Sequence, residues 1–314
     1  MKKEWGGIFP AIMVPLNEDY SINEQEYRNY IDWLISFKDQ GITGLVTNGH
    51  TGEIAGFKPS ERAQITKIAA DQAAGRVKIV SGVCAEGTYE AIEHAQAAQA
   101  AGADGILLMP PHIWLRFGMK PKSALKFFQD VAAAIDIKII VHLYPASTKA
   151  FYPIDLLLEM VQIPNVSIVK MGTRDMPLYE KDVRILQEKA PDISLLTCHD
   201  ENLLSTFIQG VDGALIGFSG CVPELITALF KAVQNEDLAE AKKVNNKLFA
   251  ASSAIYGIGQ PSGEAHARMK EFLYQRKVFT RPLMRPPLLP LDQEEIDKVT
   301  KALADCGVKP VNLV

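Results

Sequence analysis

Lys170 is the residue whose position most directly suggests chemistry. It follows the apolar residues 166–169, which have the composition of a buried parallel strand. Burial lowers the pKa of an amine, and an unprotonated amine can attack a ketone and form an iminium that withdraws electrons from the neighbouring carbon. The local pattern alone is more typical of a solvated lysine that ends a strand. Lys170 is therefore a candidate Schiff-base nucleophile whose assignment depends on the rest of the chain.

Other polar residues also follow apolar runs. Four of the six histidines do so, and the last of them is followed by Asp200: His50, His112, His142 and His199. His94 and His266 fall in segments of helical period, where we expect surface or packing roles. The glycine-rich turn 49–53 follows the second apolar run, and its N–H groups and the Thr51 hydroxyl are suited to an anion.

The elements that must position these residues repeat one pattern up to about residue 225. Short apolar runs alternate with amphipathic segments of helical period. The apolar runs are 7–14, 44–47, 77–83, 105–109, 138–143, 166–171, 194–197 and 214–218. The helical segments between them are 23–37, 60–74, 89–101, 122–134, 154–162, 179–189 and 201–209. This alternation predicts an α/β protein with a closed (β/α)₈ TIM barrel, in which active-site residues follow the carboxyl ends of the strands.

The alternation ends near residue 225, and further helices are expected. They cover 223–234, 237–255, 263–275 and 293–306. We therefore expect a catalytic barrel domain over residues 1–225 and a helical extension over 226–314 that packs on the barrel. Neither a G-x-G-x-x-G after the first strand nor a G-x-x-x-x-G-K-[ST] occurs, which disfavours the nucleotide-binding α/β folds.

The composition of the chain limits the classes of partner that we expect. The formal charge is −4 and the isoelectric point is about 5.9, so nucleic acid is not an expected partner. No apolar stretch is long enough for a membrane span, and no secretory leader is recognised. The cysteines Cys84, Cys198, Cys221 and Cys306 show no C-x-x-C spacing. We expect a cytoplasmic protein with reduced thiols, small-molecule partners, no membrane partner and no cofactor.

The turn at 49–53, Pro145 and Lys170 together resemble the N-acetylneuraminate lyase and dihydrodipicolinate synthase superfamily of class I aldolases. The resemblance extends from Gly7 to the Arg-Pro-Pro-Leu segment at 285–288. It implies that Lys170 forms the Schiff base with pyruvate or another 2-oxo acid. It also implies that Thr51 and the backbone of Gly49 and Gly52 hold the carboxylate, and that the enzyme is a homotetramer or another homo-oligomer such as a dimer.

The chain departs from the superfamily pattern at the fifth strand. Alignment on Pro145 puts His142 where most members have the tyrosine that relays protons. Tyr144 has the same strand parity, so both side chains are expected to point into the barrel, with Tyr144 nearer its mouth. An imidazole with an ordinary pKa near 6.5 is a competent acid and base at neutral pH. We prefer His142 for the proton transfer and keep Tyr144 as the alternative.

Further departures affect the second substrate. Members similar to dihydrodipicolinate synthase carry an arginine where this chain has Ser147, and Arg116 has the wrong spacing to replace it. A threonine and a tyrosine of the family correspond here to His50 and His112. Lysine biosynthesis is therefore disfavoured, and the chain is not expected to be an authentic dihydrodipicolinate synthase.

The sequence thus predicts a lyase that joins Lys170 to a 2-oxo acid and catalyses aldol cleavage, aldol addition with an aldehyde, or dehydration. Two other readings remain open. One is a metal-dependent lyase or hydrolase built on His50, His112, His142 and His199 with Asp200 or Glu53, which lacks paired ligand spacing. The other is a non-catalytic relative that binds a 2-oxo acid. The preferred hypothesis requires no metal.

Overall fold

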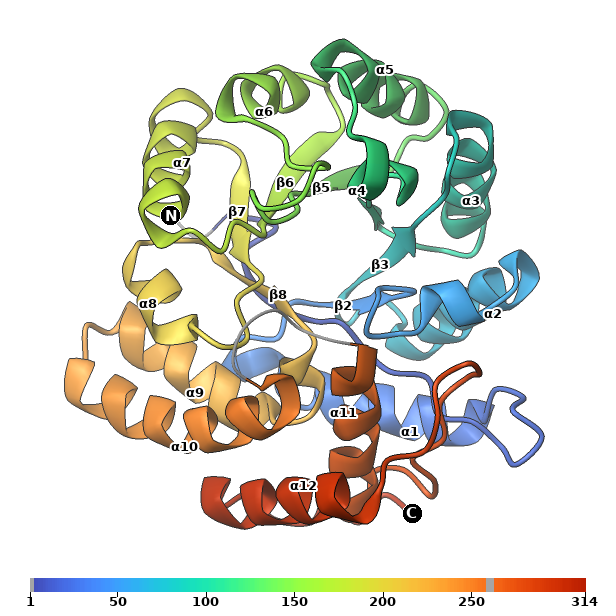
Figure 1. The fold of residues 1–314 in the computed structure, drawn as a ribbon, viewed down its shortest axis with the longest axis vertical. Helices are drawn as coiled ribbons and strands as arrows, with labels where there is room; N and C mark the ends of the chain where they lie inside the picture. The colour runs from blue at the N-terminus through green and yellow to red at the C-terminus, as the bar shows by residue number, and fades with distance from the viewer. Residues whose placement is uncertain (1–2, 258–262) are drawn as a thin grey trace.

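Eight parallel strands form the centre of the molecule in a computed structural model that describes residues 3–257 and 263–314. The strands are β1 (Gly7–Pro10), β2 (Gly44–Thr47), β3 (Lys78–Val83), β4 (Gly105–Leu108), β5 (Lys138–His142), β6 (Val166–Met171), β7 (Ser194–Thr197) and β8 (Gly213–Ile216). From β2 to β8 each strand pairs with the next one in sequence, and β8 pairs with β1. Backbone hydrogen bonds also join β1 to β2: Thr43 N–H donates to Ile8 O (3.0 Å) and Ile12 N–H to Val46 O (2.9 Å). The predicted (β/α)₈ barrel is confirmed (Figure 1).

Helices surround the strands as a ring. They are α1 (Glu24–Ile35), α2 (Pro59–Ala73), α3 (Thr88–Ala100), α5 (Pro121–Ala132), α6 (Ile154–Met160), α7 (Met176–Lys189), α8 (Leu203–Ile208) and α9 (Pro223–Gln234), with the short α4 (Ile113–Phe117) after β4. Side-chain caps fix several of their starts. Asn23 Oδ1 accepts from Glu26 N–H (3.2 Å) at α1, and Asp175 Oδ1 accepts from Leu178 N–H (3.0 Å) at α7. These caps satisfy helix N–H groups that have no partner within the helix.

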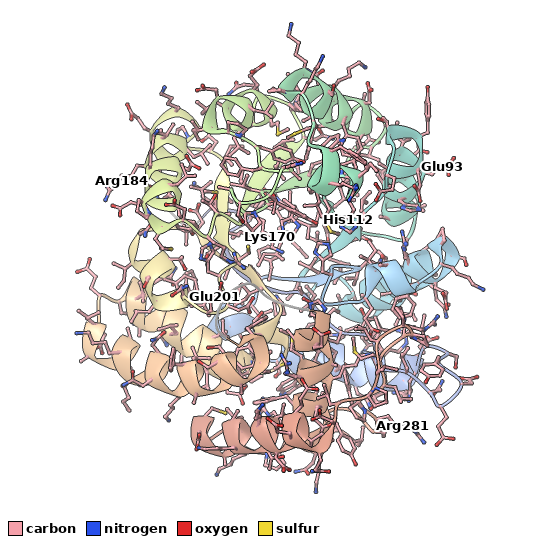
Figure 2. All side chains as sticks on the ribbon, in the orientation of Figure 1. Glu93, His112, Lys170, Arg184, Glu201 and Arg281 are labelled. Atoms are coloured by element: carbon pink, nitrogen blue, oxygen red, sulfur yellow. The ribbon has the colours of Figure 1, made fainter. Side chains whose placement is uncertain are left out.

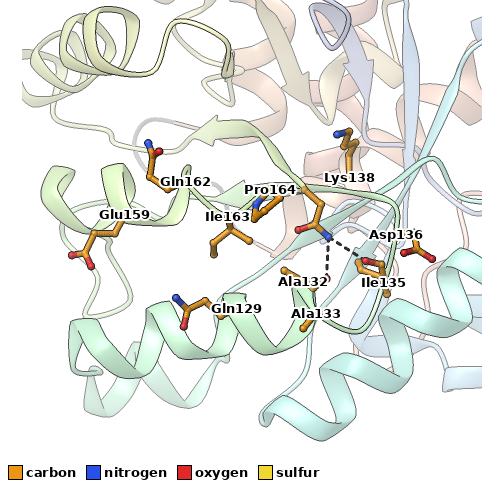
Figure 3. A pocket seen from close by; sticks show the side chains of 11 residues that line it. Gln129, Ala132, Ala133, Ile135, Asp136, Lys138, Glu159, Gln162, Ile163 and Pro164 are labelled. Carbon is orange, nitrogen blue, oxygen red and sulfur yellow. Dashed lines mark hydrogen bonds between the residues drawn. The ribbon is translucent and has the colours of Figure 1, made fainter.

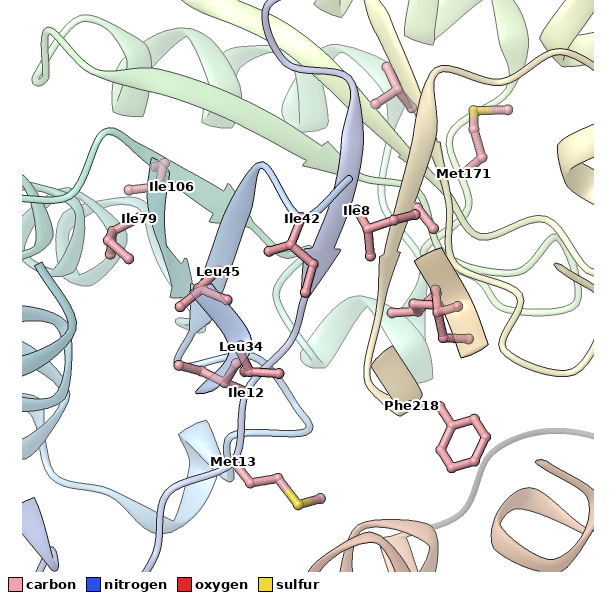
Figure 4. Close-up of a cluster of buried hydrophobic side chains, with 14 of the residues drawn as sticks. Ile8, Ile12, Met13, Leu34, Ile42, Leu45, Ile79, Ile106, Met171 and Phe218 are labelled. Atoms are coloured by element: carbon pink, nitrogen blue, oxygen red, sulfur yellow. The ribbon is translucent and has the colours of Figure 1, made fainter. Parts of the chain in front are cut away.

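Strand alternation divides the core into two layers. Side chains that point inward fill the barrel: Trp5, Phe9, Ala11, Val46, Val80, Leu107, Ile140, Ile168, Leu196 and Leu215. Their sequence neighbours, such as Ile8, Leu45 and Ile106, point outward and pack under the helices (Figure 4). Side chains thus fill the interior of the barrel. Polar residues two positions further along the strands lie directly above this apolar layer.

The C-terminal helices are α10 (Leu238–Tyr256), α11 (Gly263–Gln275) and α12 (Gln293–Cys306). They lie together outside the ring, next to α9 and α1 (Figure 1). The expected division at 225/226 falls within α9, which follows β8 and packs beside α8. We propose to count α9 as the eighth helix of the ring and α10, α11 and α12 as the extension.

Candidate functional site

A cavity of about 340 Å³ opens at the carboxyl ends of the strands. Its walls come from most of the barrel and from the extension: Ala11, His50, Thr51, His142, Leu143, Tyr144, Pro145, Lys170, Gly172, Arg174, Cys198, Asp200, Leu215, Ile216, Gly217, Tyr256, Gly263 and His266. Lys170 lies near the barrel axis when the molecule is viewed from this face (Figure 2). The cavity therefore occupies the position at which TIM barrels carry their chemistry.

Lys170 stands directly above the apolar interior. It follows the inward-pointing Ile168 by two residues and pairs in register with His142 on β5. Burial lowers the pKa of Lys170 from its ordinary value, because a charged amine loses hydration there. The amine thus lies in the cavity in surroundings that favour its unprotonated, nucleophilic form.

His142 and Tyr144 both line the cavity, as their shared parity requires. Their rings meet edge to face with centroids 4.7 Å apart. Burial and the nearby Lys170 hold the pKa of His142 well below its usual range, and burial raises the pKa of Tyr144 well above its usual range. His142 Nδ1 is buried and has no hydrogen-bond partner among the described residues. The pair therefore offers a neutral imidazole and a neutral phenol beside Lys170.

His50, His112 and Tyr144 form one hydrogen-bonded group at the rim. The Tyr144 hydroxyl lies 3.1 Å from His50 Nε2 and 3.5 Å from His112 Nε2, and the two Nε2 atoms are 3.3 Å apart. Burial, followed by Lys170, lowers the pKa of His50 to about 3. Cys84 Sγ lies 3.5 Å from His112 Nε2 at the outer end of the group. These contacts link the phenol to the two imidazoles through groups that can each donate or accept a proton.

The turn after β2 brings Thr51 to the cavity wall opposite Gly217. A Cβ at Gly217 would lie 2.7 Å from Thr51 Oγ1, so glycine is needed for this approach. A Cβ at Gly52 would lie 2.9 Å from Ile12 O. Among the described residues, the N–H groups of Thr51 and Gly52 donate to no backbone carbonyl. The turn can therefore present two N–H donors and a hydroxyl to an anion.

Glu53 ends this turn and is buried. Its backbone has a φ of 56°, in the left-handed region. Its carboxylate forms an ion pair with Lys270 Nζ at 2.6 Å and accepts a hydrogen bond from Arg285 N–H at 2.7 Å. The turn is thus anchored to α11 and to the segment that follows it.

Two histidines lie elsewhere than predicted. His199 was expected at the mouth, but it is fully buried and packs edge to face on Tyr179 of α7, with ring centroids 5.0 Å apart. It lies one residue beyond the cavity-lining Cys198, so strand alternation turns it toward the helices. His266 was expected to have a surface or packing role, but it reaches into the cavity from α11. Packing of the extension against the mouth, which helical periodicity cannot show, brings it there.

Arg174, Asp200 and Tyr256 were not predicted as substrate-contacting residues but line the cavity. Arg174 Nε bonds Glu201 at 2.9 Å, and its Nη2 donates to Cys198 O at 3.3 Å. Burial raises the pKa of Asp200 to about 6, and Asp200 Oδ1 accepts from Phe218 N–H at 2.8 Å. Lys170 was identified because it lies at the carboxyl end of a strand. The same argument applies to the residues that follow it, so it could also have identified Arg174, four positions later. Tyr256 carried no comparable signal.

The metal alternative has no geometric support in the described part of the chain, where no group of three or more His, Cys, Asp or Glu side chains is arranged to hold a metal ion. Arg116, considered as a replacement for Ser147, lies in α4 and is exposed, with its guanidinium over the Phe117 ring. Ser147 is also exposed. Neither lines the cavity.

A larger hollow of about 660 Å³ lies between α5, α6 and the start of β5 (Figure 3). It is at the amino ends of the strands, far along the barrel from Lys170. Asn165 donates there to Ala132 O (3.1 Å) and Ile135 O (3.3 Å), which ties the loops together. We interpret this end of the barrel as structural.

No helix within the described ranges is both long and apolar enough to cross a membrane.

Comparison with known proteins gives consistent matches over nearly the whole chain. The model of the dihydrodipicolinate synthetase family matches residues 4–306. The "Probable 2-dehydro-3-deoxy-D-pentonate aldolase" of Escherichia coli strain K12 is 27% identical over 313 residues, which cover 98% of this chain and 100% of that protein. The 4-hydroxy-tetrahydrodipicolinate synthase of Oleidesulfovibrio alaskensis is 31% identical over 256 residues, which cover 81% and 84%. A crystal structure of a dihydrodipicolinic acid synthase family protein from E. coli K12, in complex with pyruvate, has the same fold, with a TM-score of 0.87 and 24% identity over 96% of this chain and 98% of that one.

Proposed function

Because this chain belongs to the dihydrodipicolinate synthetase family and is a lyase of that family, we propose that it forms a Schiff base between Lys170 and pyruvate or another 2-oxo acid. The reaction is aldol cleavage or addition, or dehydration, since one iminium serves all three. The observation that carries the proposal is the Lys170 amine, which stands in the cavity with a lowered pKa beside His142.

The reaction begins when the unprotonated Lys170 amine attacks the keto carbon. The hydroxyl of the adduct takes up a proton from an acid in the cavity and leaves as water, which leaves a protonated imine that acts as the electron sink. In aldol cleavage, a base removes the proton of the hydroxyl two carbons from the imine carbon. The bond between the carbon that bears this hydroxyl and the carbon next to the imine carbon breaks. An aldehyde leaves, and the electron pair of the broken bond forms an enamine. Protonation of the enamine and hydrolysis then release the 2-oxo acid and the free amine.

The turn 49–53 supports substrate placement. Thr51, with the N–H of Gly52 and the backbone from Gly49, would bind the carboxylate and aim the keto carbon at Lys170. The absence of a side chain at Gly217 leaves room for the Thr51 hydroxyl at the wall. Fixed donors in a site with little water stabilise charge without reorganisation.

We propose His142 as the residue that moves the proton, with Tyr144 as the alternative. His142 is neutral, lines the cavity and pairs with Lys170 across β5 and β6. Tyr144 already bonds His50 and His112. These two imidazoles would hold the phenol in place and, with it, contact the substrate.

The second substrate is proposed to be an aldehyde other than the one used by dihydrodipicolinate synthase. Ser147 provides no guanidinium for a second carboxylate, and Arg174 already bonds Glu201. Asp200 and Tyr256 instead present oxygen atoms that suit hydroxyl groups near the reacting carbons.

We also propose a homo-oligomeric assembly, tetramer or dimer. Ile113, Leu115 and Phe117 of α4 are exposed beside the mouth, and an interface there would cover them. Light scattering during gel filtration tests this.

Borohydride trapping tests the Schiff base. The protein is incubated with pyruvate and borohydride, and its intact mass is compared with those of Lys170→Ala and of the matched variant Lys78→Ala on β3. We expect the reduced pyruvyl adduct in the parent and in Lys78→Ala but not in Lys170→Ala. No adduct in the parent with pyruvate or longer 2-oxo acids would refute the proposal.

A further inference from the structure

A second hollow adjoins the cavity of Lys170, and the two share His50 and His266 as walls. Its volume is about 300 Å³. The sides come from the 3-10 turn η2 (Ile54–Gly56) and from the proline segment 286–288 that follows α11. We call this hollow the distal groove. It extends the site outward between the turn that follows β2 and the C-terminal extension.

The charged groups beside the distal groove are engaged by partners. The Glu53 carboxylate forms an ion pair with Lys270 Nζ and accepts a hydrogen bond from Arg285 N–H. The Arg285 guanidinium bonds Glu61 at 2.7 Å and lies 4.5 Å from the centroid of the Phe57 ring. The remaining side chains of the groove are apolar: Ile54, Ala55, Pro286, Pro287 and Leu288.

The passage between the two hollows is also uncharged. Burial lowers the pKa of His266 to about 4 and that of His50 to about 3, so both rings are neutral at neutral pH. An apolar chain can pass these rings without removing an ion from water.

We propose that the distal groove binds the apolar far end of a 2-oxo acid whose keto carbon is joined to Lys170. This inference rests on the proposed function and extends it to the substrate class: 2-oxo acids, or their aldol products, that carry an alkyl or aryl end. Oxygen atoms near the reacting carbons meet Asp200 and Tyr256, and the end of the chain passes His50 and His266. The two hollows have similar volumes, so the groove nearly doubles the space for substrate.

The test is borohydride trapping with straight-chain 2-oxo acids, from pyruvate to 2-oxooctanoate. The concentration that gives half-maximal adduct is measured for each acid by intact mass. Burial of one methylene contributes about 0.8 kcal/mol, so each methylene that enters the groove should lower this concentration about three- to fourfold. The first methylenes, which remain in the cavity of Lys170, should change it less.

Ala55→Trp fills the groove from an exposed position on η2. Ala239→Trp, at an exposed position of α10, is the matched control. We expect Ala55→Trp to remove the gain for the longer acids and to leave pyruvate trapping unchanged, and Ala239→Trp to change neither.

The outcomes separate the two proposals. Failure of every 2-oxo acid in the series, pyruvate included, to form an adduct refutes the proposed function. Pyruvate trapping without tighter binding of longer acids refutes the groove alone. Tighter binding that Ala55→Trp does not reduce places the chain end elsewhere and also refutes the groove.

Discussion

Lys270 and Glu53 form a buried ion pair, with Lys270 Nζ 2.6 Å from Glu53 Oε1 and both side chains almost fully excluded from solvent. Lys270 also donates to Leu283 O at 2.5 Å. The pair joins the C-terminal helix α11 to the turn that holds Thr51. A residue far from the barrel in sequence thus helps to set the geometry of the proposed carboxylate site.

Breaking this pair should affect both stability and binding. Removal of one partner leaves a buried charge without compensation, which costs about 3 to 5 kcal/mol. We expect Lys270→Met to lower the free energy of unfolding by an amount of this order and to raise the KM for the 2-oxo acid. Urea unfolding and initial rates measure the two effects. The double variant Lys270→Met with Glu53→Gln should be more stable than Lys270→Met alone, and a double variant that is no more stable would contradict the pairing argument.

Replacement of Lys170 should separate stability from activity. Lys170→Met removes an amine whose pKa is lowered by burial. The folded state then no longer carries the free-energy cost of removing this charged group from water. We expect turnover to be lost and the thermal midpoint to stay equal or rise. Calorimetry and a pyruvate release assay test both parts, and a well-folded Lys170→Met enzyme with turnover would exclude the Schiff-base role.

His142→Phe and Tyr144→Phe distinguish the two proton carriers. General acid–base catalysis typically contributes about 10²- to 10⁴-fold in rate. We expect His142→Phe to lower kcat by about 10² or more, while Lys170 still forms the borohydride adduct. If Tyr144→Phe produces the large loss and His142→Phe does not, the role belongs to Tyr144.

Asp182 on α7 should make stability depend on pH. Both of its carboxylate oxygens are buried without a hydrogen-bond partner in the described structure, and burial raises its pKa from 3.8 to about 6. The folded state then holds its proton more tightly than the unfolded state. The stabilising contribution is complete below about pH 4 and is lost as the pH rises through about 6.

Asp182→Asn should remove this loss of stability at higher pH. We expect it to unfold at a higher urea concentration than the parent at pH 7, by on the order of 2 kcal/mol, and to show little difference near pH 4. Asp192→Asn, at an exposed position, is the control. An equal effect of the two substitutions at pH 7 would contradict the burial argument.

The barrel was predictable because its signals are local. Eight apolar runs and their helical partners each appear in a short window, and inward parity placed His142, Tyr144 and Lys170 together correctly. Proximity to the strand ends was not sufficient for His199, because one residue of strand parity decides between the cavity and the helices.

The contribution of the extension was not predictable in this way. His266 and Tyr256 enter the cavity from α11 and α10, which reach the mouth through contacts between distant segments. The ion pair of Glu53 with Lys270 joins residues that are 217 positions apart in sequence. Helical periodicity predicts which face of such a helix is buried, but not which part of the barrel it covers.

The pairing of Lys170 with His142 limits how this site can be altered. Both residues are held by a ladder that runs through all eight strands, and a slip of either strand by one residue would turn its own side chain toward the helices. The separation of amine and imidazole is therefore a property of the closed sheet and not of either strand. Substitutions can change the length and chemistry of these two side chains, but strand pairing keeps the distance between their backbone positions the same.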